Sequence, residues 1–504
     1  MSSTTTPPQS QLSTALAKDR LGVAAVVFFV MSAAAPLTVV AGVVPTGIAV
    51  TGLTNISIAF IAMAVVLAIF AVGYVAMSRH IANAGAFYAY ISQGIGRPFG
   101  VGGAWLALLA YNCFQFASYG GVGAIATPLL KDWFNVDVKW WVVALVCWAL
   151  TAVLGVRDVA VNGRVLATLL VAEILLVLVF SVANVLSPHF HASAAPLDVK
   201  SLVGSGAGAL LAMAITGFVG FEQSVVFAEE SRDPRRTVAR ATYIAIALIA
   251  GLYGFAAWSM ISAAGPNVVD RAGKEQLDLF FNVASERVGS AAVNLGHTLF
   301  LTSLIAAMIS FHNIISRYTF SLGREGVLPR LFGRTVPGTG APKNGSLAQS
   351  VLGLIVIVIY AVAGWDPLVQ LFFWGGSAGG IGVLLLITVA SVAVIGYFAR
   401  HPQGEDFWHR IGAPIVGTIL LLVMSYLTLT NIATLFGVAP GSGPTWVVPL
   451  AFGVVSLAGI LWALVLRATR SDIYAGIGLG ARSVTTGSGG GGFAAALAGD
   501  KGAK

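Results

Sequence analysis

Charged residues are scarce in this sequence. Only 10% of its 504 residues are Asp, Glu, Lys or Arg, whereas 57% are hydrophobic. Soluble domains carry about 25% charged residues, so this chain cannot cover itself with polar surface in water. We therefore expect a protein that has the lipid bilayer as its solvent. The formal net charge of +8 does not indicate a nucleic-acid partner, because the loops of membrane proteins are basic.

Cysteine is nearly absent as well. Cys113 and Cys147 both lie in apolar stretches, and their spacing supports neither a disulfide framework nor a metal site. No cofactor is expected. Residues 1–17 lack the basic region of a signal peptide, so we expect a disordered cytoplasmic tail there. The Gly-rich residues 471–504 predict a second flexible cytoplasmic tail.

Long apolar stretches dominate the rest of the chain. Each is long enough for the roughly 20 residues that a helix needs to cross a bilayer. The sequence therefore predicts an all-α membrane protein with twelve transmembrane helices. These lie near residues 22–50, 54–77, 99–128, 139–156, 164–186, 203–230, 241–264, 290–320, 347–364, 367–396, 412–437 and 445–467.

The basic residues favour one orientation of these spans. If both termini lie inside, all but six of the 28 Lys and Arg residues fall on inner segments. This bias follows the positive-inside rule. We expect a multi-pass protein of the cell membrane with both termini cytoplasmic. The six outer residues are Lys131, Lys139, Lys200, Arg271, Lys274 and Arg287.

Two of the twelve spans contain helix breakers at corresponding positions. The first span holds Pro36, which has no N–H and must kink or unwind the helix. The sixth span holds Gly217 and Gly220, which lower the cost of leaving helical geometry. Interrupted helices at matching places in two halves indicate a transporter site. The alternative is that Pro and Gly serve only as kinks or close-packing points.

Three segments resemble the signatures of the amino acid–polyamine–organocation permeases. They are GFEQSVVFAEESRDPRRT at 220–237, NAGAFYAY at 83–90 and RYTFSLGREGVLP at 317–329. The resemblance extends over roughly residues 15 to 470. It implies a LeuT-like fold in a transporter domain over 18–470, with inverted five-helix repeats at 22–186 and 203–396 and accessory helices at 412–467. Family members move amino acids, polyamines and related cations by proton symport, sodium symport or exchange.

The resemblance places substrate at the two helix breaks. It implies binding residues Ser32, Ala33, Ala35 and Thr38 in the first break, and Thr216, Gly217, Phe218 and Phe221 in the second. Tyr111 and Gln115 form a polar group within the third span, where apolar residues would be cheapest. We expect them to line the cavity, although hydrogen bonding between helices explains either one equally well.

Acidic residues supply the remaining candidates. Glu173 and Glu222 are the two carboxylates well inside the predicted spans, where a charge costs several kcal/mol. We interpret both as proton-coupling residues, with a structural hydrogen bond as the alternative for each. We interpret Glu229, Glu230, Asp233 and the basic run through Arg240, which includes Arg235 and Arg236, as an ion-pair network that forms an inner gate. A solvated loop is an equally good alternative.

These observations favour a secondary transporter over an enzyme. The resemblance implies an amino acid substrate, which we expect to be taken up by alternating access with protons as the coupling ion. A polyamine transporter and an amino acid exchanger of the same fold remain alternatives. A membrane-embedded enzyme is a remote one, because no nucleophile–base pair or metal cluster is visible at membrane depth.

Overall fold

The computed structural model describes residues 16, 21–81, 83–157, 159–188, 190–204, 206–336, 339–480 and 483, with the backbone alone over 159–165 and at position 286. These residues form helices and no β-strand. In chain order the α-helices are α1 (Val23–Ala34), α2 (Pro36–Thr38), α3 (Val44–Thr51), α4 (Ile56–Ser78), α5 (Phe87–Gly94), α6 (Arg97–Phe134), α7 (Trp140–Gly155), α8 (Val159–Val185), α9 (Ala207–Phe218), α10 (Pro234–Ala264), α11 (Val268–Glu275), α12 (Leu279–Arg324), α13 (Lys343–Ala363), α14 (Trp374–Arg400), α15 (Ala413–Thr430), α16 (Ile432–Phe436), α17 (Gly443–Thr469) and α18 (Ser471–Gly476).

Ten helical segments of the described chain are long and apolar enough to cross a membrane. They overlap ten of the twelve predicted spans. The other two predicted spans lie in α6 and α7. α6 has 38 residues, but its glycines and polar residues such as Asn112 and Gln115 lower its hydropathy. α7 is apolar and only 16 residues long.

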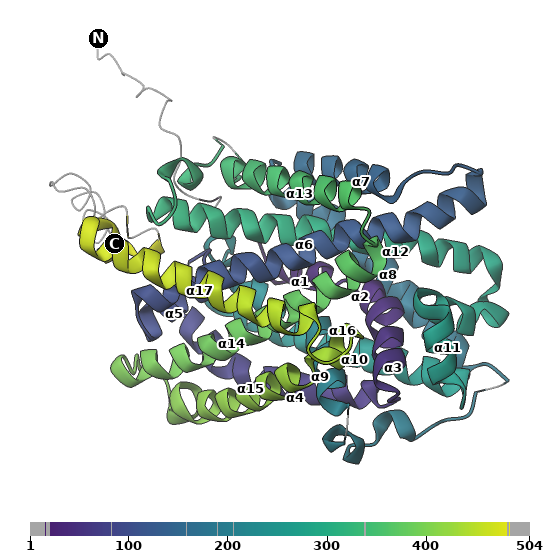
Figure 1. Cartoon of the computed structure of the whole chain (residues 1–504). Coiled ribbons are helices and arrows are strands. Elements are labelled where there is room, and N and C mark those ends of the chain that lie inside the picture. The colour runs from purple at the N-terminus through teal and green to yellow at the C-terminus, as the bar shows by residue number, and fades with distance from the viewer. Residues whose placement is uncertain are drawn as a thin grey trace, which may run out of the picture.

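The long helices run along a roughly common axis (Figure 1). The segment Ala207–Val225, which begins with α9, is the most deeply buried of the ten: 94% of its most apolar stretch is buried within the protein. In Gly443–Thr469, which is α17, the same share is 17%. α17 therefore lies at the periphery. Leu450, Val454 and Leu457 form an exposed apolar stripe along it, which is the surface expected of a lipid-facing helix.

The two ends of the bundle can be told apart by their contacts. At one end, Leu21 forms an isolated parallel bridge with Ser231, and Arg97 at the start of α6 donates to the carbonyl oxygen of Ala475 in α18. We call this end the terminal face, because the described chain begins and ends there. α3 and α11 pack together at the opposite face (Figure 1).

Candidate functional site

The first helix is interrupted at Ala35. α1 ends at Ala34, and Ala35 takes the left-handed conformation (φ 46°, ψ 72°) before Pro36 begins α2. Pro36 has no N–H for the helical ladder, and a left-handed residue other than glycine costs about 1–2 kcal/mol. A π-helical segment, Val39–Val43, follows, and such segments are frequent at functional sites. The first helix is thus interrupted next to Pro36, as the sequence predicts.

The second interruption lies at Val219 and Gly220. α9 ends at Phe218, Val219 has ψ 127°, and Gly220 has φ 120°. A Cβ atom on Gly220 would lie 2.9 Å from the carbonyl oxygen of Val30 and 2.9 Å from the Cβ of Ala33. Any side chain there would collide with α1. The two broken helices are therefore in direct contact.

Glu222 forms a bridge across the second break. It lies in the 3₁₀ turn that follows Gly220 and is fully buried. Its Oε2 accepts a hydrogen bond from the Gly220 N–H at 2.9 Å, and its Oε1 accepts one from the Tyr111 hydroxyl at 3.1 Å. The Tyr74 hydroxyl donates to the backbone carbonyl oxygen of Glu222 at 2.9 Å. Both carboxylate oxygens thus have a partner, one in the unwound backbone and the other in α6.

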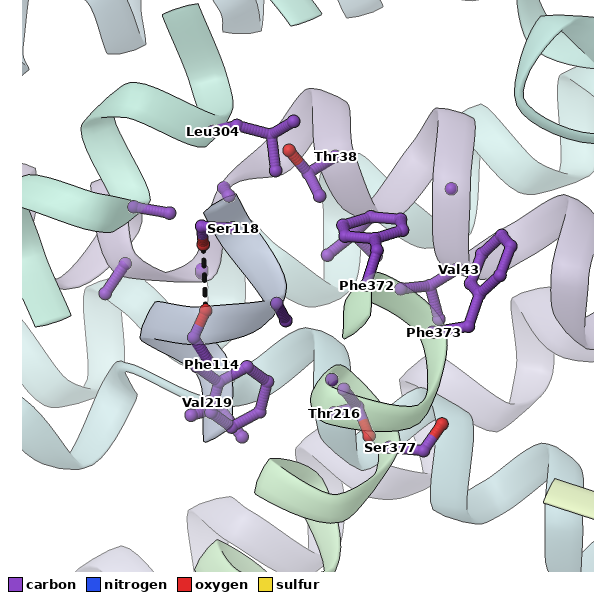
Figure 2. A pocket seen from close by; sticks show the side chains of 18 of the residues that line it. Thr38, Val43, Phe114, Ser118, Thr216, Val219, Leu304, Phe372, Phe373 and Ser377 are labelled. Atoms are coloured by element: carbon purple, nitrogen blue, oxygen red, sulfur yellow. Dashed lines mark hydrogen bonds between the residues drawn. The ribbon is translucent and has the colours of Figure 1, made fainter. Parts of the chain in front are cut away.

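A cavity of about 90 Å³ lies beside the two breaks (Figure 2). Its walls come from the first helix on both sides of Ala35, from α6, α9 and α12, and from the start of α14. The residues that line it are Ala33, Ala34, Ala35, Thr38, Val39, Gly42, Val43, Thr46, Phe114, Ala117, Ser118, Met213, Thr216, Val219, Leu304, Ala307, Phe311, Phe372, Phe373, Gly376 and Ser377.

Four of the ten predicted binding residues line this cavity: Ala33, Ala35, Thr38 and Thr216. The other six are not among its lining residues: Ser32, Tyr111, Gln115, Gly217, Phe218 and Phe221. The positions of the two helix breaks thus correctly predict where the cavity lies. The other six predicted residues are close to the breaks or in α6, but they do not line the cavity.

Packing explains why the predicted aromatic residues lie outside the cavity. The Phe218 ring is 6.3 Å from the Phe60 ring, and the Phe221 ring is 6.2 Å from the Phe70 ring. Both phenylalanines are buried in the apolar core. A Cβ atom on Gly217 would lie 3.0 Å from the Phe60 ring, so this glycine serves close packing.

The polar residues of α6 make contacts between and within helices. Tyr111 binds Glu222, and the Gln115 side chain donates to the Tyr119 hydroxyl at 2.9 Å. The cavity is instead lined by Phe114 and Ser118, which lie on a different face of the same helix. Tyr111 thus makes a hydrogen bond to another segment, whereas the Gln115 hydrogen bond stays within α6.

Sequence reasoning missed the contributions of α12 and α14 to the cavity. Leu304 and Phe311 come from α12, and Phe372 and Phe373 come from the π-helical segment that precedes α14. Nothing in the apolar pattern separates these residues from packing residues. The one available signal was the FFWGGS run at 372–377, where bulky aromatics meet two glycines in a membrane span.

Glu173 lies close behind the cavity wall and is 1% exposed. The Ser303 side chain and the Leu37 backbone interact with its carboxylate. The Thr38 hydroxyl, which lines the cavity, donates to the Ser303 hydroxyl at 3.1 Å. Glu173 Oε2 has no hydrogen-bond partner among the described residues. A buried carboxylate is thus connected to the cavity through two hydroxyls.

Two ion pairs join the segment after the second break to α12 at the terminal face. Glu229 accepts from Arg324 at 2.7 and 2.8 Å, and Glu230 accepts from Arg317 at 2.6 and 3.0 Å. The side chains of the second pair are only 2% and 3% exposed, so this pair is shielded from water.

The expected pairing of these glutamates with the nearby basic run differs from the structure. Arg235 donates to the Arg79 carbonyl oxygen at 3.2 Å. Arg236 lies 3.7 Å from Asp233, with its side chain 78% exposed. The partners of Glu229 and Glu230 come instead from α12, which the fold brings against this segment.

A third carboxylate, Glu325, is buried at the terminal face. Its Oε1 accepts from the Asn83 amide at 3.0 Å and the Gly480 N–H at 2.8 Å. Its Oε2 accepts from the Tyr88 hydroxyl at 2.6 Å and the Gly478 N–H at 2.6 Å. Burial raises the pKa of Glu325, while the hydrogen bonds from Tyr88, Gly478 and Asn83 oppose the shift.

Residues 471–480 therefore differ from the flexible tail that their composition predicts. They begin with α18 and then place two glycine amides on Glu325. Gly478 and Gly480 have φ of 79° and 64°, a conformation that glycine adopts without strain. Apart from residues 16 and 483, the predicted tail at 1–17 and residues 481–504 lie outside the described residues.

A helical bundle of this kind, with two broken helices around a central cavity, defines a multi-pass membrane protein of the transporter class. The sequence profile of the amino acid permease family matches residues 21–462. The chain therefore belongs to this family, whose members are transporters and not enzymes.

Several characterised and uncharacterised transporters are similar to this chain. The lysine-specific permease LysP of Lactococcus lactis is 26% identical over 417 residues, or 76% of each protein. A probable GABA permease of Pseudomonas aeruginosa is 24% identical, over 69% of this chain and 73% of its own length. An uncharacterized transporter of Mycobacterium tuberculosis is 26% identical over 43% of this chain, and the match spans 45% of that transporter.

Proposed function

We propose that this protein is a secondary active transporter that carries amino acids into the cell by alternating access, coupled to protons. The observation that carries the proposal is the cavity at the contact of two broken helices. Unwound backbone within a membrane needs a polar partner. The Gly220 N–H and the Ala34 carbonyl oxygen already have partners in Glu222 and Tyr253, and in this proposal other N–H and C=O groups at the two breaks bind the carboxylate and ammonium of an amino acid. The buried ion pairs of Glu229 and Glu230 form the closed gate on one side.

Glu173 is the proton carrier in this proposal. It has an unpartnered carboxylate oxygen in a buried site, and a charge at such a position is costly unless it is compensated. Protonation removes that cost, and the hydroxyls of Ser303 and Thr38 link Glu173 to the substrate cavity. Glu222 is the weaker candidate, because both of its carboxylate oxygens already accept hydrogen bonds, from the Gly220 N–H and the Tyr111 hydroxyl.

The membrane arrangement follows from the same proposal. α6 and α7 join the ten long apolar segments to give twelve spans, arranged as two inverted repeats and two accessory helices. The terminal face is cytoplasmic, because it carries the basic loops that contain Arg79, Arg235 and Arg236. The cavity is bordered by Val43 and Thr46, which lie on the helix that leads to the opposite face. The ion pairs of Glu229 and Glu230 lie at the terminal face. In this proposal the described state is therefore closed towards the cytoplasm.

Uptake by reconstituted protein tests the proposal. Proteoliposomes with an acidic outside should accumulate amino acids, and collapse of the pH gradient should abolish accumulation. Gly220→Ala should lose uptake, because its Cβ would collide with Val30 and Ala33. Gly251→Ala is the matched control, since a Cβ there meets nothing within 4 Å. Folded wild-type protein that neither binds nor moves any of the twenty amino acids would refute the proposal.

A further inference from the structure

The chemistry of the cavity wall selects among amino acids. None of the described residues that line the cavity is an Asp, Glu, Lys, Arg or His. The polar side chains on the wall are hydroxyls only, from Thr38, Thr46, Ser118, Thr216 and Ser377. A charged group that is buried without a counter-charge is strongly disfavoured, so a charged substrate side chain has no partner on this wall.

The hydroxyl hydrogens of three of these residues are already used. Ser118 donates to the Phe114 carbonyl oxygen at 2.9 Å (Figure 2), and Thr216 donates to the Ala212 carbonyl oxygen at 3.0 Å. Thr38 donates to Ser303. These hydroxyls have no hydrogen left for an anionic side chain. The wall therefore offers no positive charge and few free donors.

The two buried glutamates do not change this conclusion. Glu173 is separated from the cavity by Thr38 and Ser303, and Glu222 is held by Tyr111 and Gly220. Neither lines the cavity. A lysine-like ammonium group in the cavity would therefore not reach a carboxylate directly.

Bulky apolar side chains fill the rest of the wall. Phe372 lies beside Thr38 and Phe373 lies beside Val43 (Figure 2), and the two rings are 5.2 Å apart. The Phe114 and Phe311 rings stack at 5.0 Å. Apolar contact with such rings favours an aliphatic substrate side chain, because it removes apolar surface from water.

The size of the cavity limits the substrate further. A single water needs ~10–15 Å³ of such space, so a cavity of about 90 Å³ admits a small molecule but not a large one without a change in the wall. An aromatic amino acid needs a rearrangement of Phe372, whose ring borders the cavity beside Gly42.

We propose that the cavity takes a zwitterionic amino acid with a small, uncharged, aliphatic side chain. This inference rests on the proposed amino acid transport. It separates the protein from its lysine-specific relative, because recognition of a lysine side chain requires a counter-charge that this wall does not carry. It also disfavours polyamines, which carry at least two positive charges and no carboxylate.

Competition against labelled leucine in proteoliposomes tests the inference. Alanine, valine and leucine should inhibit uptake, whereas lysine, arginine, aspartate and putrescine should inhibit at least tenfold more weakly. Equal inhibition by lysine or aspartate would overturn the inference and leave amino acid transport standing. Uptake of putrescine with no uptake of any amino acid would refute the proposed transport as well.

A matched pair of variants tests the role of the wall. Phe372→Ala should raise the affinity for phenylalanine at least tenfold relative to leucine, because it removes the ring that limits the cavity. Phe407→Ala should leave the ranking unchanged, since Phe407 is 66% exposed and lies outside the cavity. An unchanged ranking in Phe372→Ala would contradict the assignment of this wall. If Phe372→Ala fails to fold, Leu304→Ala replaces it, because Leu304 also lines the cavity, with the same expectation for bulkier side chains.

Discussion

The buried pair of Arg317 and Glu230 offers the sharpest test of the proposed gate. The two side chains are almost fully buried, and their bidentate contact measures 2.6 and 3.0 Å. Arg317 also lies 5.0 Å above the Phe227 ring and donates to the Asn313 carbonyl oxygen at 3.2 Å. Removal of one partner leaves an uncompensated buried charge, which costs about 3–5 kcal/mol.

A double-mutant cycle measures this cost. Arg317→Met and Glu230→Met should each lower the melting temperature of the purified protein strongly. The double variant should be less destabilised than the sum of the single variants, with a coupling energy of about 1–3 kcal/mol. Arg236→Met is the control, because its exposed contact with Asp233 is worth about 0–1 kcal/mol.

The same variants should also open the terminal face. Ser32 is 1% exposed in the described state, and Ser32→Cys, in a protein without its two native cysteines, reports access from that side. Every 1.4 kcal/mol lost from the closed state raises the open population about tenfold. Arg317→Met should therefore accelerate labelling of Ser32→Cys by a hydrophilic thiol reagent. Unchanged labelling, together with additive effects on stability, would refute a gating role for the pair.

Three further predictions concern coupling, topology and the end of the chain. Glu173→Gln should still bind substrate but lose uptake driven by a pH gradient; accumulation with wild-type pH dependence would exclude it as the proton carrier. In intact cells, Lys139→Cys should react with an impermeant thiol reagent and Arg236→Cys should not, and the reverse pattern would invert the proposed orientation. In Glu325→Gln, the new side-chain NH₂ group faces N–H and O–H groups that are themselves donors, so hydrogen bonds to Gly478 or Gly480 are lost. Hydrogen exchange at the Gly478 amide should then accelerate at least tenfold. Unchanged protection would show that the carboxylate does not hold this segment in place.

The fold was largely predictable because its main signals are local. Apolar runs located ten of the membrane helices directly, and the helix breaks followed from Pro36 and Gly220. Both residues act through the backbone: one lacks an N–H, and the other tolerates φ 120° and close contact with α1. Such effects depend on the residue itself and its immediate neighbours, so a sequence reveals them.

The side-chain partners were less predictable because they depend on packing between distant segments. Arg317 is far from Glu230 in sequence, whereas Arg235 is close to it, and proximity along the chain favoured the wrong partner. Likewise, Phe372 lines the cavity and Phe218 does not. In a chain with 28 phenylalanines, no local pattern separates a wall residue from a core residue.

The contacts around the gate imply that its parts move together in the proposed transport cycle. The Leu21 N–H donates to the Glu230 carbonyl oxygen at 3.1 Å, and the Arg232 N–H donates to the Leu21 carbonyl oxygen at 3.0 Å. The start of α1 is thus bound to the segment that carries both gate glutamates. Gly220 presses the same segment against Val30 further along α1. Opening towards the cytoplasm therefore requires α1 and this segment to leave α12 as one unit, with both ion pairs broken in a single step. Loss of one pair should then weaken the whole gate and not only its own half.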